Sequence, residues 1–238
     1  MKRLLLPVLL LLTLGACQRD SDEDVVQPED KDWYILTSPD NRAIQAVHGD
    51  IDGTLVITTN YKIYQTKDRG KTWSTANYTS NLGLFGFLQQ QDTLLALNAQ
   101  LGNASNSTVA YAAGPSHFSL DEGATWKPYR NWRWKVDWEP RIARNRVTSP
   151  AGTEYSIDYL LTPISPNSSS SYVETVGVKT STGRSLSLPQ QHQLTSLYMD
   201  AKSRLYVTGS APVCGRGDKF AFCGEQNGTL YVSKSSQP

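Results

Sequence analysis

Two stretches of eight residues, Thr66–Trp73 (TKDRGKTW) and Ser119–Trp126 (SLDEGATW), follow one pattern and decide the fold. In this pattern Asp accepts hydrogen bonds from backbone N–H groups inside a hairpin turn, and Gly adopts a positive φ. Trp lies in the following strand and packs between sheets. We therefore predict a structural and not a catalytic role for the shared residues. These are Thr66, Asp68, Gly70, Thr72 and Trp73 in the first copy, and Ser119, Asp121, Gly123, Thr125 and Trp126 in the second.

The spacing of the two copies indicates the architecture. They lie 53 residues apart, which is about the length of one four-stranded propeller blade. Weaker strand–turn–strand patterns occur at residues 46–58 and 196–208, and no window shows a sustained helical period. The 12 Tyr, 6 Trp and 17 Gly, with only 2 Met, also favour strands and turns. The chain is predicted to be all-β.

Four blades fit the length of the chain. They are predicted at residues 40–79, 80–130, 140–190 and 191–238, so the last blade lacks its outer strand. The isolated strand pattern at 33–37 is expected to supply it, because propellers commonly close by joining their two termini in one blade. A five-bladed ring and an open β-sandwich are the alternatives.

The repeated pattern resembles the Asp box of BNR-repeat β-propellers. Bacterial sialidases in this superfamily use an arginine triad, a Tyr–Glu pair and an Arg-Ile-Pro signature. Here Arg141-Ile142-Ala143 lacks the proline, and the adjacent Glu154 and Tyr155 would point to opposite faces of a strand. The chain is more similar to the photosystem II assembly factor family and to the sortilin ectodomain, which hold polypeptides. This resemblance implies a non-catalytic binding or assembly module, with a sialidase-like glycoside hydrolase as the alternative.

The N-terminal sequence predicts export and membrane anchoring. Lys2 and Arg3 precede the apolar run 4–14, which has the length of a secretory signal. Leu14-Gly15-Ala16-Cys17 resembles the bacterial lipobox, which implies cleavage after residue 16 and a lipidated Cys17. Residues 17–32 hold seven acids and two bases and are predicted to be a flexible tether to the domain at 33–238. We expect an outer-membrane lipoprotein, exposed at the cell surface or on the periplasmic face.

Three long connections are expected to gather on one rim of the propeller. They cover residues 98–107, 162–171 and 210–228, and their Gly, Ser, Asn and Pro content predicts irregular structure. A glycan or a protein is the expected ligand of this rim. Cys214 and Cys223 should form a disulfide in an oxidising compartment. Its loop holds Arg216-Gly217-Asp218, so Arg216 and Asp218 are candidate ligand contacts.

An aromatic and basic run follows the second turn motif. Trp132, Trp134, Trp138 and Arg141 could bind sugar faces, carboxylates or peptides, or the tryptophans could be buried between blades. Other ligand classes are disfavoured. The 23 Lys+Arg and 22 Asp+Glu give a net charge of +1, without the basic excess of a nucleic-acid-binding protein. With three His and no His/Asp cluster, no metal or cofactor is expected.

Overall fold

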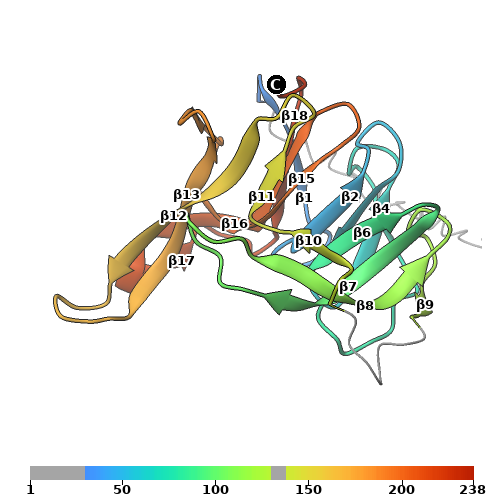
Figure 1. The fold of residues 1–238 in the computed structure, drawn as a ribbon, viewed down its shortest axis with the longest axis horizontal. Coiled ribbons are helices and arrows are strands. Elements are labelled where there is room, and N and C mark those ends of the chain that lie inside the picture. Colours follow the sequence, from blue (N-terminus) through green and yellow to red (C-terminus); the bar gives the residue numbers. More distant parts are fainter. Residues whose placement is uncertain (1–29, 130–137) are drawn as a thin grey trace, which may run out of the picture.

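The computed structural model describes residues 30–129 and 138–238, and their strands form four antiparallel sheets (Figure 1). Each sheet is one blade of a small β-propeller, so the predicted all-β, four-bladed architecture is confirmed. Blade 1 contains β2 (Ala46–Gly49), β3 (Leu55–Thr58), β4 (Ile63–Thr66) and β5 (Ser74–Thr75). Blade 2 contains β6 (Gly86–Gln90), β7 (Thr93–Leu101), β8 (Tyr111–Ser119), β9 (Lys127–Pro128) and β10 (Arg141–Ala143).

The other two blades follow in chain order. Blade 3 contains β11 (Arg146–Thr148), β12 (Glu154–Pro163), β13 (Ser171–Thr180) and β14 (Ser185–Leu186). Blade 4 contains β15 (His192–Met199), β16 (Leu205–Gly215), β18 (Thr229–Ser233) and, as its outer strand, β1 (Trp33–Thr37). The short strand β17 (Ala221–Phe222) pairs with the far end of β16, beyond a 3-10 turn at Gly217–Lys219.

The N-terminal strand closes the propeller as predicted. β1 runs antiparallel to β18, with Trp33 opposite Ser233 and Thr37 opposite Thr229. This pairing covers the outer edge of β18, which would otherwise present free backbone groups. The two ends of the described domain therefore lie together in one blade.

Two details differ from the sequence prediction. Residues 141–143 form β10 on the edge of blade 2, where they pair with Tyr111, Ala112 and Ala113. The two-residue β9 pairs only with the other end of β8, so β10 covers the remaining edge. The long connections are also more regular than expected, because β7, β12 and β16 run on to Leu101, Pro163 and Gly215. Their extended hairpins satisfy their own backbone groups.

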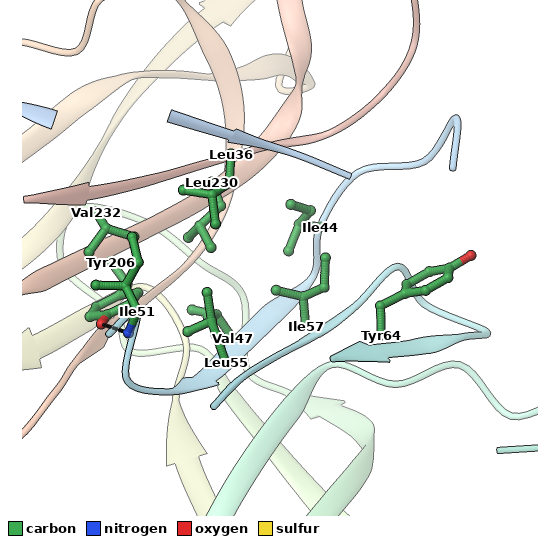
Figure 2. Close-up of a cluster of buried hydrophobic side chains, with 10 residues drawn as sticks. All are labelled: Leu36, Ile44, Val47, Ile51, Leu55, Ile57, Tyr64, Tyr206, Leu230 and Val232. Carbon is green, nitrogen blue, oxygen red and sulfur yellow. Dashed lines mark hydrogen bonds between the residues drawn. The ribbon is translucent and has the colours of Figure 1, made fainter. Parts of the chain in front are cut away.

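The largest core cluster lies where blade 4 meets blade 1 (Figure 2). Leu36 and Leu230 come from blade 4, and Leu55 and Ile57 from blade 1, and all four side chains are buried. The Tyr206 hydroxyl accepts a hydrogen bond from the Ile51 backbone N–H at 3.0 Å and donates one to Asp200 at 2.9 Å. The Tyr64 hydroxyl also has a partner, since it donates to Asp40 at 2.9 Å. Burial of the apolar side chains, with both hydroxyl groups satisfied, holds the two ends of the ring together.

The two turn motifs have nearly identical geometry. Asp68 Oδ1 accepts bonds from the Thr66 hydroxyl (2.7 Å) and the Thr72 N–H (2.9 Å), and Asp121 Oδ1 does the same with Ser119 and Thr125. Gly70 and Gly123 have φ of 78° and 87°, which a side chain would disfavour. These residues therefore build the turns, as their types predict.

The tryptophans of the motifs differ in burial. Trp126 is only 4% exposed and lies in a cluster shared by blades 1 and 2, where its Nε1 donates to the Gly123 carbonyl at 2.9 Å. Trp73 is half-buried against the cluster between blades 4 and 1, and its Nε1 has no hydrogen-bond partner among residues 30–129 and 138–238. The expected packing between blades is therefore complete only for Trp126.

Candidate binding surfaces

The propeller has two chemically different faces. The turns within the hairpins β2–β3, β6–β7 and β15–β16, together with the two turn motifs, lie on one face, here called the turn face. The connections β7–β8, β12–β13 and β16–β18 lie on the opposite face, here called the loop face. Each face holds one feature suited to binding.

Hydrogen bonds tie the three loop-face connections to one another. The side chain of Asn106 donates to the Tyr159 carbonyl at 2.8 Å and accepts from the Tyr159 N–H at 2.9 Å, which joins the β7–β8 connection to β12. The Gly217 N–H donates to Glu174 of β13 at 3.0 Å. The connections of blades 2, 3 and 4 thus form one rim, as the sequence predicted.

The predicted disulfide is present. Cys214 and Cys223 are bonded, with their Cα atoms 5.0 Å apart. Within the loop, Arg216 donates to the Gln191 side chain from both Nε and Nη2, and Asp218 lies in the 3-10 turn. Arg216 is therefore held against blade 4 while both residues stay on the rim.

Exposed apolar side chains gather beside this loop. The hairpin β12–β13 projects away from the other strands, and β17 lies next to it (Figure 1). Seven of the ten exposed large apolar side chains among the described residues belong to these two segments, which we call the arm. They are Leu160, Leu161, Ile164, Val173 and Val176 of the hairpin, and Phe220 and Phe222 of the disulfide loop. Sequence reasoning missed the arm, because the hairpin tip reads as a polar connection.

The structure describes only part of the aromatic and basic run that was predicted to bind a ligand. Trp132 and Trp134 lie outside the described residues. Trp138 is 44% exposed, and the Arg141 guanidinium lies over the Tyr111 ring, 4.9 Å from its centroid. Arg141 and Arg216 belong to different blades, so the structure does not join these candidates into one site.

The residues that resemble a sialidase set have other partners. Glu154 pairs with Arg146 at 3.2 Å, while Tyr155 is buried and donates to the Pro238 carbonyl at 2.8 Å. Arg144 donates to the side chains of Gln100 (2.7 Å) and Gln45 (3.2 Å), and burial lowers its pKa to about 10. Sequence reasoning missed Arg144 as a buried residue, because its neighbours come from three blades.

A cavity of about 670 Å³ opens on the turn face. Blade 1 supplies His48, Thr54 and Val56 to its wall, blade 2 supplies Gln89, Asp92, Leu94 and Glu122, and blade 4 supplies Tyr198 and Asp200. The sequence-based expectation placed binding on the loop face alone. The cavity was missed because it forms only when the first, second and last blades meet.

Aromatic rings and uncharged groups line the inner part of this cavity. The rings of His48 and Tyr198 lie 5.4 Å apart, and the Tyr198 hydroxyl accepts a bond from the Gly49 N–H at 3.4 Å. Burial lowers the pKa of His48 to about 4, against an opposing hydrogen bond with Gln89. The imidazole is therefore neutral at neutral pH.

An ion-pair cluster supports the blade 4 side of the cavity. The Arg204 side chain is only 8% exposed and donates to Asp200 (2.7 Å), to Asp52 (2.6 Å) and to Asp50. Lys202 also pairs with Asp50, at 2.8 Å. Hydrogen bonds from Arg204 hold the pKa of Asp52 at about 2. These cations are engaged with their own carboxylates and join blade 4 to blade 1.

The described residues contain neither a metal-binding cluster nor a membrane-spanning helix. Across residues 30–129 and 138–238, no group of three or more His, Cys, Asp or Glu side chains could hold a metal ion. Over the same ranges, no helix is long and apolar enough to cross a membrane.

Comparison with known proteins shows only distant similarity. No family model matches the chain, and no curated protein matches it. Among solved structures, YCF48 from Cyanidioschyzon merolae is 13% identical with a TM-score of 0.28, over 80% of this chain and 70% of its own. A structure titled "YCF48 bound to D1 peptide" is 10% identical with a TM-score of 0.32, over 88% and 97% of the two chains. These similarities are too low to carry an argument about function.

Proposed function

We propose that this chain is a lipid-anchored outer-membrane propeller that binds a protein partner, without catalysis, through the arm on its loop face. The concentration of exposed apolar side chains on the arm carries this proposal. Single exposed apolar residues are ordinary on a protein surface, whereas several on one projecting segment are typical of an interaction site. Leu161 is 56% exposed, and Val173, opposite it on the neighbouring strand, is 53% exposed.

The chemistry of the arm favours a protein over a glycan at this face. Sugars are recognised by aromatic rings combined with many hydrogen-bonding groups, whereas five of the seven arm side chains are aliphatic, and the two aromatic ones, Phe220 and Phe222, have no hydrogen-bonding group. Such surface is stabilised by burial against apolar side chains of a partner. We expect the contact to be insensitive to salt, because screening weakens charge pairs but not apolar contacts.

The partner would bind as an extended segment. On its outer side β13 pairs with β14 only at Val178 and Lys179, and β12 pairs with β11 only at residues 154–156. Beyond Tyr159, whose backbone N–H and C=O bind the Asn106 side chain, the hairpin therefore offers strand edges beside the apolar side chains. An added strand would gain both main-chain hydrogen bonds and side-chain burial.

The anchor is proposed from the sequence. Leu14-Gly15-Ala16-Cys17 provides the cleavage and lipidation site, and several acyl chains would give stable attachment where one would be marginal. The acidic segment 17–32 would then connect the lipid to the propeller.

Site-specific photo-crosslinking in cells tests the proposal. A photoreactive residue at Leu161 should crosslink a defined partner, and the same probe at Ser169, at the hairpin tip, should give less of that product. In a second series the probe is placed at Val173. The double substitution Leu161→Asp, Ile164→Asp should then abolish the crosslinked product, whereas Ser169→Asp should not. A partner that crosslinks equally in all these variants would contradict the proposal.

A further inference from the structure

We infer that the cavity on the turn face is a second ligand site, which binds one or two units of an uncharged carbohydrate. This site is separate from the arm and does not depend on the proposed function. Its walls come from blades 1, 2 and 4, so the folded ring builds it. Its volume of about 670 Å³ lies in the range of about 300–1,000 Å³ that is typical of small-molecule sites.

The inner wall suits the apolar face of a sugar ring. Tyr198 and His48 place two rings there, with centroids 5.4 Å apart and planes tilted by 56°. A pyranose has one face dominated by C–H groups, which packs on such rings and side chains. Because His48 is neutral, an anionic group placed here would have to lose its water without a compensating positive charge.

The mouth suits hydroxyl groups. Asp92 and Glu122 are exposed there with Gln91, and Glu122 already accepts a hydrogen bond from the Thr54 hydroxyl at 2.7 Å. Carboxylates accept hydrogen bonds, and two oxygens on one group can receive two neighbouring hydroxyls. Gln89 adds an amide that can both donate and accept.

The charges around the cavity exclude acidic sugars. Among the described residues, sixteen line the cavity, and none of these is Lys or Arg. The nearest cations, Lys202 and Arg204, are paired with Asp50, Asp52 and Asp200. A ligand carboxylate would therefore meet Asp92 and Glu122 without a partner, which costs free energy. The same absence of a cation on the walls argues against a sialic acid ligand here.

Titration calorimetry of the full chain with defined sugars tests the inference. The probes are cellobiose, maltose, lactose and N,N′-diacetylchitobiose, each up to about 10 mM, with sialyllactose as the acidic probe. At least one neutral disaccharide should bind with a Kd in the millimolar range or tighter, and sialyllactose should not. Asp92→Ala and Gln89→Ala should each weaken the binding about tenfold while leaving the melting temperature near that of the wild type.

Asp218→Ala is the matched control, because it removes an acid from the disulfide loop on the opposite face and should leave the affinity unchanged. The inference is overturned when no neutral disaccharide binds, when the two cavity variants bind like the wild type, or when sialyllactose binds as tightly as the neutral sugars. None of these results affects crosslinking at Leu161, so this inference and the proposed function stand or fall separately.

Discussion

Gly123 of the second turn motif lies directly against Val56 of the neighbouring blade: a Cβ on Gly123 would come within 2.7 Å of Val56 Cγ2. The first motif repeats this relationship, because a Cβ on Gly70 would come within 2.8 Å of Leu36. Each motif glycine is thus required both by the conformation of its own turn and by close packing against the adjacent blade.

Substitution of Gly123 should therefore cost more than backbone strain alone. Gly123→Ala adds a Cβ that must displace Val56. The new alanine must also adopt a φ of 87°, which L residues disfavour. We expect a loss of about 2–4 kcal/mol in the free energy of unfolding. Gly152→Ala is the matched control, because its φ is 89° and no atom lies within 4 Å of the new Cβ. It should cost only about 1 kcal/mol. Equal losses in urea denaturation would show that the contact between blades contributes nothing.

The two motif tryptophans should differ although the sequence predicts the same role for both. Trp126→Ala empties a buried position between blades 1 and 2 and breaks the bond to the Gly123 carbonyl, so it should cost about 3–5 kcal/mol. Trp73→Ala should cost clearly less, because Trp73 is half-buried and its Nε1 has no partner in the part of the chain that the structure describes. Asp68→Ala and Asp121→Ala should each cost about 1–3 kcal/mol by removing the turn acceptors. Thermal and urea unfolding of the four variants would measure this order, and a Trp73→Ala variant as unstable as Trp126→Ala would contradict it.

The stability of the domain should fall as the pH drops from about 6.5 to 4. Burial lowers the pKa of His48 to about 4, so in this window the unfolded chain binds a proton that the folded chain does not. The unfolded state is thereby favoured, by about 3 kcal/mol at most for this residue. Burial lowers the pKa of His117 and His192 as well, so their effects have the same sign.

His48→Gln tests this assignment. Urea denaturation between pH 4 and 7 should show a shallower slope for His48→Gln than for the wild type, with a residual slope from the other two histidines. Below pH 4 a further loss is expected from Asp68, whose pKa is held at about 2 chiefly by the hydrogen bond from the Thr72 hydroxyl. An unchanged slope between pH 4 and 6.5 in His48→Gln would disprove the assignment.

Replacement of Cys17 should release the protein without unfolding it. Cys17→Ser removes the thiol that would carry the lipid, so labelling with a radioactive fatty acid and recovery in the membrane fraction should both be lost. Cys17 precedes the described residues, and the expected tether 17–32 precedes the closing strand β1, so the melting temperature of the purified protein should not change. An intact mature form whose wild-type Cys17 carries no lipid would refute the anchor.

Local sequence predicted the parts of the fold that short-range chemistry determines. The turn motifs, the four blades, the closing strand and the disulfide follow from residue types and spacing. By contrast, β10 joined blade 2 because β9 is too short to cover the edge of β8, and this depends on pairing between distant strands. Edge coverage of this kind has no signal within a window of sequence.

The candidate sites were harder to predict for the same reason. His48, Glu122 and Tyr198 lie far apart in the chain and meet only after three blades assemble. The arm was hidden because Leu161 and Ile164 sit beside a Ser- and Pro-rich tip, and only the projection of the hairpin from the ring leaves them uncovered.

The register of the closing strand also determines which way the molecule would point when anchored. Trp33 pairs with Ser233, and the Asp32 carbonyl accepts from the Lys234 N–H at 2.9 Å, so the preceding chain leaves the propeller at its turn face. From Cys17 that chain could reach at most about 50–55 Å. In an anchored propeller the tether would therefore be attached at the turn face, on the side opposite the arm. A partner on the arm could then bind without contacting the point of attachment, while a sugar in the cavity would share its face with the tether.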